Sequence, residues 1–225
     1  VKAVTDVQLS GTIRSFLTEK GSNSLRTSRL YYNTKEQMDR IKSYMDAYEI
    51  GITMIGVNGR EYVTDRSYWK ISMDQLYHHE ITNRARKEPK RLVYQYYREK
   101  TPQSDGVIVA TKALIDRTTG KIYGMLYISI REKEFKRFYN DFTSTGNDVV
   151  ILDRTGMVLS SNRGKWIGRR NPGLLKDARE IVEAGSDYKN GRVMGKHQLI
   201  LAEYLPDCSL YLVNLIDRDF ARSQM

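Results

Sequence analysis

Gly51-Ile52-Thr53-Met54-Ile55-Gly56-Val57-Asn58-Gly59 is an apolar run that ends in a tight turn, and a second short run, Glu61 to Asp65, follows it. The Asn-Gly pair tolerates the positive φ that a short hairpin turn requires. The same order recurs where Asp148 to Leu152 leads through Asp153-Arg154-Thr155-Gly156 into Met157 to Ser161. The chain therefore contains the same predicted hairpin twice.

Three further strands are predicted after each hairpin, again in the same order. Alternating or apolar segments bounded by turn residues indicate them. They are residues 91–99, 107–116 and 121–130 in the first half, and residues 187–194, 197–205 and 210–216 in the second half. Repetition of five strands in one order predicts two similar modules in one polypeptide.

A pair of amphipathic helices is predicted in front of the first hairpin. Residues 1–20 carry apolar side chains at near-helical spacing, and the Gly-Ser-Asn-Ser sequence of residues 21–24 breaks the pattern. Thr34 and Gln37 match a capping box, in which two polar side chains satisfy the first amide groups of a helix. We therefore expect the second helix to begin at Thr34.

Each module also carries a predicted helical insert between its second and third strands. Ser72 and Gln75 match another capping box, and the helix that they open should run to about Arg86. In the second module, residues 173–184 carry one apolar face, and a connecting helix is expected at residues 131–146. Each module should be a five-stranded antiparallel sheet with helices on one side, which is an α+β arrangement.

The composition fits a folded chain with a basic surface. The 225 residues are 40% hydrophobic and 28% charged, with a net charge of +10 and a pI near 9.5. No apolar window approaches the roughly 18 residues that a membrane-spanning helix needs. The basic residues gather at 84–91 and 163–170, which match no nucleic-acid-binding motif. We interpret them as a solvated surface facing an anionic cell envelope or membrane, and a nucleic-acid-binding role is the alternative.

The residues that usually carry catalysis or bind metals lack the required spacing. Cys208 is the only cysteine, which excludes an intrachain disulfide and a cysteine-rich metal site. His78-His79 and His197 lack metal-ligand spacing, and Ser160-Ser161 lacks the glycines of a nucleophile elbow. We expect no catalytic residue, no metal and no cofactor in this chain.

The order of these motifs resembles the double Cache domain, a tandem PAS-like extracytoplasmic sensor of bacterial transmembrane receptors. The most specific pieces are residues 51–59, 116–124 and 149–156. The sequence is most similar to the outer domains of sensor histidine kinases, and chemotaxis receptors and cyclic-dinucleotide enzymes carry similar domains. The resemblance implies a long N-terminal amphipathic helix followed by two PAS-like modules.

The resemblance also implies a division of the chain and its place in a receptor. Residues 1–34 would be the N-terminal helical segment, 35–146 the membrane-distal module, 147–216 the membrane-proximal module and 217–225 the start of an exit helix. The chain begins at Val1 without an initiator methionine, so we expect a piece of a longer protein. Transmembrane helices would flank it, the receptor would be a homodimer, and the distal module would hold the ligand.

A small-molecule pocket is expected in the first module, because aromatic faces bury a ligand while a few polar groups orient it. Arg66 and Lys112 could meet a carboxylate, and Asp116 could meet an amine. Strand tyrosines that only pack the sheet are the alternative. The candidate ligand-binding residues are Arg66, Tyr68, Trp69, Tyr77, Tyr94, Tyr96, Lys112 and Asp116.

The class of ligand stays open at this point. The amino-acid-binding members of the family carry a run of Tyr, Arg, Trp and Tyr with a later Asp. Tyr62, Arg66 and Trp69 are of similar type but have shifted spacing, and no Asp aligns with the later acid. The ligand could be an amino acid, another small metabolite or a peptide. A basic envelope-binding module with no pocket is the alternative function.

Overall fold

The computed structural model describes residues 2–21, 23–64, 69, 71–99 and 105–223. The chain divides into two compact units. The first contains Val1–Gln95 and Val109–Arg131, and the second contains Tyr96–Ile108 and Glu132–Met225. The N-terminal segment thus belongs to the same unit as the first sheet. The module bounds 35–146 and 147–216 stay predictions.

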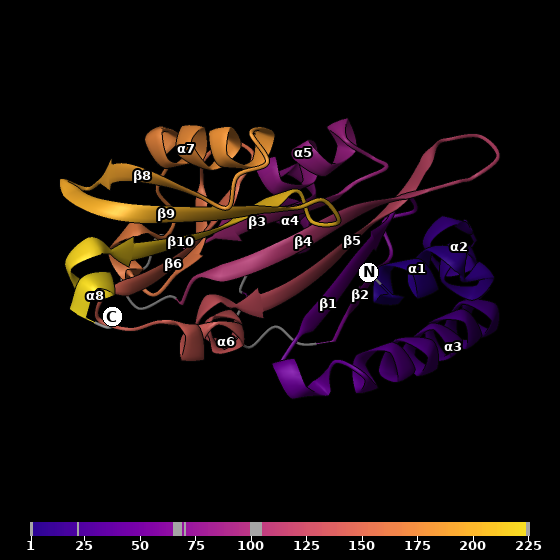
Figure 1. The fold of residues 1–225 in the computed structure, drawn as a ribbon. Helices are drawn as coiled ribbons and strands as arrows, with labels where there is room; N and C mark the ends of the chain where they lie inside the picture. The colour runs from indigo at the N-terminus through magenta and orange to yellow at the C-terminus, as the bar shows by residue number, and fades with distance from the viewer. Residues whose placement is uncertain (1, 22, 65–68, 70, 100–104, 224–225) are drawn as a thin grey trace. The chain divides into compact units, whose positions relative to one another are not determined.

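The first sheet is antiparallel and has the strand order β2-β1-β5-β4-β3 (Figure 1). Its strands are β1 (Gly51–Gly56), β2 (Glu61–Val63), β3 (Leu92–Tyr97), β4 (Val107–Ile115) and β5 (Ile122–Arg131). In the pairing of β1 with β5, Thr53 lies opposite Tyr127. The five strands that the sequence predicts for this half are confirmed.

The second sheet repeats this order as β7-β6-β10-β9-β8. Its strands are β6 (Asn147–Asp153), β7 (Val158–Ser161), β8 (Tyr188–Val193), β9 (Lys196–Leu205) and β10 (Leu210–Asp217). The hairpin turns also match, because Gly59 N–H donates to the carbonyl of Gly56 and Gly156 N–H to that of Asp153, both at 3.0 Å. Two five-stranded modules in one α+β chain are therefore confirmed.

Helices α1 (Lys2–Leu9), α2 (Gly11–Thr18) and α3 (Ser24–Ser43) precede the first sheet. A single helix over residues 1–20 is wrong, because Ser10 interrupts it. The Ser10 hydroxyl accepts from the backbone N–H of Ile13 at 3.1 Å and donates to Gln37 at 2.7 Å. Such an N-cap begins a new helix.

The helix start predicted at Thr34 is also wrong. Asn23 is the N-cap of α3, with its side chain accepting from the N–H of Arg26 at 3.3 Å. Thr34 lies inside the helix and is fully buried. The long N-terminal helix is therefore α3, of 20 residues, and it starts ten residues before the predicted position.

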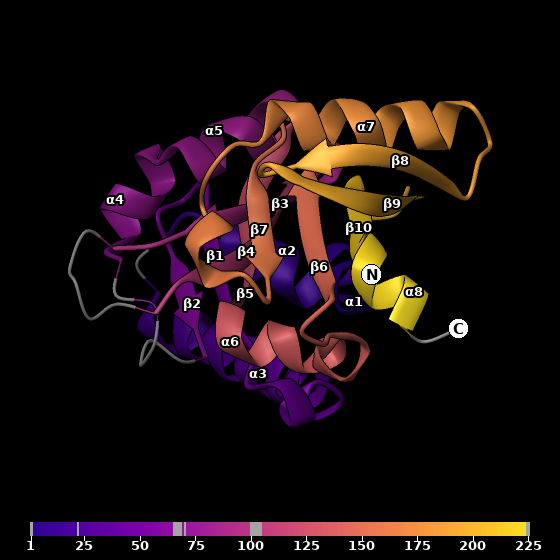
Figure 2. The ribbon, with the colours of Figure 1, turned by 60° about the vertical axis from the view of Figure 1, so that its left-hand side comes forward.

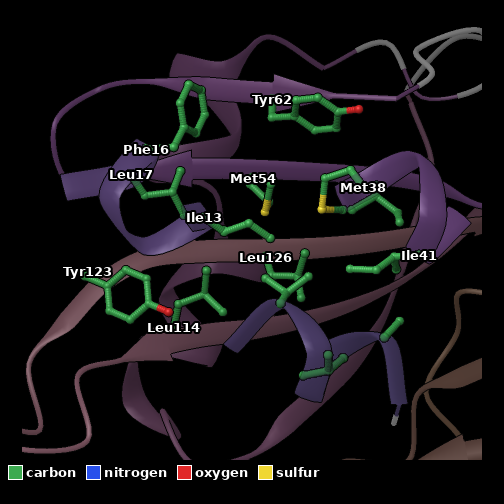
Figure 3. Packing of buried hydrophobic residues seen from close by; sticks show 14 residues of the cluster. Ile13, Phe16, Leu17, Met38, Ile41, Met54, Tyr62, Leu114, Tyr123 and Leu126 are labelled. Carbon is green, nitrogen blue, oxygen red and sulfur yellow. The ribbon is translucent and has the colours of Figure 1, made fainter. Parts of the chain in front are cut away.

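The core of the first unit lies between these helices and one face of the sheet. Figure 3 shows Ile13 and Leu17 of α2 and Met38 of α3 meeting strand residues such as Met54 and Leu126. All five side chains are at most 1% exposed. Burial of this apolar stripe stabilises the contact between the N-terminal helices and the sheet.

The helical inserts follow the predicted positions. Helices α4 (Met73–His78) and α5 (Glu80–Lys87) occupy the first insert, and the capping box of Ser72 and Gln75 is confirmed. A break at His79 divides the single helix that was expected. In the second unit, α7 (Pro172–Glu183) lies along β8 and β9 (Figures 1 and 2).

The connection after β5 is less helical than predicted. Helix α6 (Glu132–Phe135) has four residues, and 3₁₀ turns follow at Lys136–Phe138 and Asn140–Phe142. Two more 3₁₀ turns lie at Asp46–Tyr48 and Gly164–Trp166, and α8 (Arg218–Ser223) follows the last strand. Within the residues that the structure describes, no helix has both the length and the apolar character needed to cross a membrane.

Candidate functional site

The face of the first sheet that points away from the N-terminal helices carries buried polar side chains. Neighbouring strand residues point to opposite faces. Leu126 and Leu114 belong to the core under the N-terminal helices, so Tyr127 and Thr111 point to the other side. We call this set of residues the polar sheet face, and all of them are at most 6% exposed: Thr53, Gln95, Thr111, Tyr127 and Ser129.

Helices α4 and α5 contact the polar sheet face through hydrogen bonds. Thr82 Oγ1 donates to the carbonyl of Leu76 at 2.5 Å and lies 2.6 Å from Tyr127 Oη. Since the single hydroxyl proton of Thr82 goes to that carbonyl, Tyr127 is the donor of the second bond. Gln95 Nε2 donates to the carbonyl of Ile81 at 3.1 Å. Two consecutive residues of α5, Ile81 and Thr82, thus join the insert to the sheet.

An aromatic ring packs against the ring of Tyr127. Trp69 packs edge-on against the Tyr127 ring, with ring centroids 6.1 Å apart and an interplanar angle of 69°. Burial raises the pKa of Tyr127 to about 12, and the hydrogen bond with Thr82 and the charge of Arg86 act in the opposite direction. The phenol therefore stays neutral and available as a hydrogen-bonding group at neutral pH.

Arg86 is half-buried on α5 and places its guanidinium over the ring of Tyr77, 4.2 Å from the ring centroid. Its Nη1 donates to Asn83 Oδ1 at 3.2 Å. Its Nη2 is buried and meets no acceptor among the residues that the structure describes. One edge of the guanidinium thus donates to Asn83, while the Nη2 edge has no acceptor among the described residues.

Thr111 also carries an unsatisfied group. Its side chain is fully buried in β4, and its hydroxyl oxygen has no hydrogen-bond partner within the described part of the chain. A buried hydroxyl without a partner costs about 1–3 kcal/mol. This unpaired hydroxyl lies on the same sheet face as Tyr127.

This cost predicts an unusual result for Thr111→Val. Without ligand, the substitution should raise the free energy of unfolding by about 1 kcal/mol, because it removes an unpaired hydroxyl at nearly constant volume. Thr82→Val is the matched control and should lower it by about 1–3 kcal/mol, because that hydroxyl has two partners. Urea unfolding of both variants is the measurement. A loss of more than 1 kcal/mol in Thr111→Val would contradict the assignment of an unpaired hydroxyl.

The equivalent face of the second sheet is apolar. The matched hairpin turns align Thr53 with Val150. Thr53 pairs with Tyr127 across the first sheet and Val150 pairs with Val213 across the second, so Val213 corresponds to Tyr127. Both valines are fully buried in a core that includes Leu174 of α7. The two modules share a fold, but only the first presents hydroxyl groups to its insert at this pair.

The predicted site residues divide between several places. Trp69 and Tyr77 lie with Tyr127 and Arg86 as described above. Arg66 and Tyr68 lie outside the described residues, so their roles stay predictions.

Tyr94, Tyr96 and Lys112 are not brought together with Trp69. Leu92 packs against the core under the N-terminal helices, and strand alternation gives Tyr94 and Tyr96 the same facing. Lys112 shares the facing of Leu114, and its Nζ donates to the backbone carbonyls of Pro89 and, at 3.0 Å, Ala113. Burial lowers the pKa of Lys112. Backbone carbonyls therefore already hold the ammonium group that was expected to meet a carboxylate.

Asp116 lies at the turn between β4 and β5. Its Oδ1 accepts from the backbone N–H groups of Thr118 and Thr119, both at 2.8 Å, and its Oδ2 pairs with Arg14 of α2. Tyr127 is six residues along β5 from the end of this turn, which is about 20 Å of extended strand. The structure places this carboxylate in the turn and not beside the aromatic residues.

Sequence reasoning missed Tyr127, Thr82, Thr111 and Arg86. The alternation of β5 and β4 indicates that Tyr127 and Thr111 are on one face, but not which face the insert covers. Arg86 was grouped with the solvated basic run at 84–91, whereas the structure half-buries it over Tyr77. The helix predicted to run to about Arg86 already places Arg86 one turn after Thr82, which is the signal that could have grouped the two residues.

The arrangement offers hydroxyl groups, aromatic faces and one cation. Groups of these kinds can bind and orient a small molecule. Among the described residues, no group of three or more His, Cys, Asp or Glu side chains could hold a metal ion.

No protein-family model matches the chain, and no curated protein matches it significantly. Solved structures do match it. The ligand-binding domain of the amino acid chemoreceptor PctB of Pseudomonas aeruginosa, in complex with L-Gln, is 12% identical with a TM-score of 0.62, and the match covers 100% of this chain and 90% of that chain. The ligand-binding domain of the Pseudomonas fluorescens chemoreceptor CtaA, in complex with L-isoleucine, is 12% identical with a TM-score of 0.58, covering 100% of this chain and 84% of that chain.

A third match comes from a different class of receptor. The extracellular domain of a protein assigned to the histidine kinases is 9% identical with a TM-score of 0.61, and the match covers 99% of this chain and 86% of that chain. At such identities the similarity concerns the fold. The chain has the fold of these ligand-binding and extracellular domains over almost its whole length.

Proposed function

We propose that this chain is the extracytoplasmic ligand-sensing domain of a membrane-bound signal-transduction receptor. Its first unit would bind a small molecule beside the polar sheet face. One observation carries this proposal: the buried pair Thr53 and Tyr127 corresponds to the valines Val150 and Val213 in the second sheet. A sheet face that served only packing would carry apolar side chains at both places.

The matched structures support a small ligand of the amino acid class as the first candidate. Three of the domains with this fold are described in complex with L-isoleucine, asparagine or L-Gln. In this chain the proposal retains Trp69 and Tyr77 from the predicted set and adds Tyr127, Thr82 and Arg86. Binding would be read out as a change of conformation, which requires that the ligand bind one conformation better than the other.

For the output domain we propose a histidine kinase, in a homodimeric receptor with transmembrane helices flanking this chain. The matched extracellular domain assigned to the histidine kinases supports this choice. A chemotaxis receptor is the alternative, and the two matched chemoreceptor domains support it equally. The sensing role of this domain is the same in both cases.

A thermal-shift panel tests the sensing function. Amino acids, organic acids, sugars, nucleobases and polyamines are added to the protein at high excess. At about one hundred times the dissociation constant, a ligand stabilises by about 2.7 kcal/mol. For a chain of this size that should raise the melting temperature by about 5–10 °C.

The two tryptophans provide a matched pair of variants. Trp69→Ala should abolish the shift, because Trp69 packs on Tyr127. Trp166→Ala, in the second unit, should retain it. No shift with any compound would count against the sensing function. Salt-sensitive binding to anionic lipid vesicles, lost on neutralising Lys90, Arg91, Arg169 and Arg170, would then favour the envelope-binding alternative.

A further inference from the structure

We propose that Arg86 binds a carboxylate group of the ligand. The inference rests on the proposed function and names the chemistry that the site recognises. Arg86 has one guanidinium edge fixed by Asn83 and the other, at Nη2, buried without an acceptor among the described residues. A buried charged donor without a partner is costly, and a bound anion would remove that cost.

The position of the guanidinium is already set before any ligand arrives. The ring of Tyr77 lies under it at 4.2 Å, and the bond to Asn83 Oδ1 fixes its rotation. A planar guanidinium held in this way presents its remaining N–H groups in a fixed direction, which suits the two oxygens of a carboxylate. The side chain therefore loses little further conformational entropy on binding.

The charges around Arg86 favour an anion. Every member of the polar sheet face is neutral. Glu80 of α5 is exposed, and Glu88, which follows α5, forms an ion pair with Arg91 at 3.6 Å. The charge of Arg86 acts on the pKa of Tyr127, so this cation lies close to the polar sheet face. A single cation matches a singly charged group such as a carboxylate better than a doubly charged phosphate.

The aromatic side chains favour a second chemical feature in the ligand, beside its carboxylate. Trp69 and Tyr127 meet edge to face, and Tyr77 lies beneath the guanidinium. Aromatic walls favour a small apolar or flat body next to the carboxylate. Amino acids and simple carboxylic acids share this chemistry, and the experiment has to distinguish them.

The test uses three matched series of probes. They are L-amino acids, the corresponding carboxylic acids without the α-amine, and the corresponding α-carboxamides. Dissociation constants are measured by calorimetry on the 225-residue chain. We expect binding of at least one carboxylate-bearing probe and at least tenfold weaker binding of its carboxamide. If the acid without the α-amine binds, the domain is a carboxylate sensor. If only the L-amino acid binds, the domain is an amino acid sensor.

Arg86→Met should raise the dissociation constant of the bound carboxylate by about 10–100-fold, because a charge-assisted hydrogen bond is lost. Arg86→Lys should raise it less, since the charge remains and the planar fork is lost. Lys87→Met is the control. It removes the same charge from the next, exposed residue and should leave the constant within about twofold.

The possible outcomes separate this inference from the proposed function. Equal binding of a carboxylate and its carboxamide overturns the inference, as does an unchanged constant in Arg86→Met. Binding of only amines or sugars does the same. In each of those cases the sensing function stands, because a small molecule is bound. Failure of every probe and of the wider thermal panel overturns both.

Discussion

Leu17→Ala is expected to lower the free energy of unfolding of the first unit by about 2–5 kcal/mol. Leu17 is fully buried in the core between α2 and the sheet. Its backbone lies so close to Gly56 that a β-carbon there would come within 2.4 Å of the Leu17 carbonyl oxygen. The surroundings are therefore too constrained to collapse into the cavity that the substitution leaves.

Leu25→Ala provides the matched control for this prediction. Leu25 lies on α3 and is 82% exposed, so its truncation should change stability by no more than about 0.5 kcal/mol. Urea unfolding followed by tryptophan fluorescence measures both, with Trp69 reporting on the first unit and Trp166 on the second. If the two variants unfold at the same urea concentration, α2 does not contribute to the core as the structure indicates.

Alkaline pH is expected to destabilise the first unit well below the pH at which Tyr127 ionises in the folded chain. Burial raises the pKa of Tyr127 to about 12, compared with about 10 for an unfolded tyrosine. Between these values the folded state retains a proton that the unfolded state has lost, so stability falls as the pH rises. The contribution is fully present below pH 10 and is lost by about pH 12. Two pKa units correspond to about 3 kcal/mol.

Unfolding free energies measured from pH 8 to pH 12 test this expectation. Tyr127→Phe should flatten the decrease, although it also removes the hydrogen bond to Thr82. Tyr32→Phe is the control, because this side chain is 68% exposed and meets water in both states. Burial raises the pKa of Tyr62 and Tyr123 in the same unit as well, so part of the pH dependence should remain in Tyr127→Phe. An unchanged slope in that variant would contradict the assignment.

Strands could be predicted from the sequence because their periodicity is local. The run at 51–57 and its echo at 148–152 carry both the apolar pattern and the turn residues. Helix starts were less predictable, because a capping box depends on which polar group actually meets a backbone N–H. Thr34 and Gln37 have the right spacing, yet Asn23 caps α3 and Gln37 accepts from Ser10. That contact spans 27 positions and has no local signature.

The candidate site was only partly predictable for a related reason. Alternation shows that Tyr94 and Tyr96 share a face, but the choice of which face lies under α4 and α5 depends on packing between distant segments. The side chain of Asp116 could be predicted to be polar and near a turn, but its bond to Arg14 joins residues 102 positions apart. Arg86 illustrates the converse, since a charge run in the sequence does not reveal which member is half-buried.

The repeated fold gives the two sheets different constraints on their residues. At Val150 and Val213, packing constrains only the size and the apolar character of the side chain. Other side chains that match in both can therefore replace these valines at a modest cost in stability. Tyr127 also makes a hydrogen bond with Thr82, so a change at Tyr127 removes a specific contact as well as volume. A duplicated module thus lets one copy diversify its chemistry while the other preserves the architecture that both share.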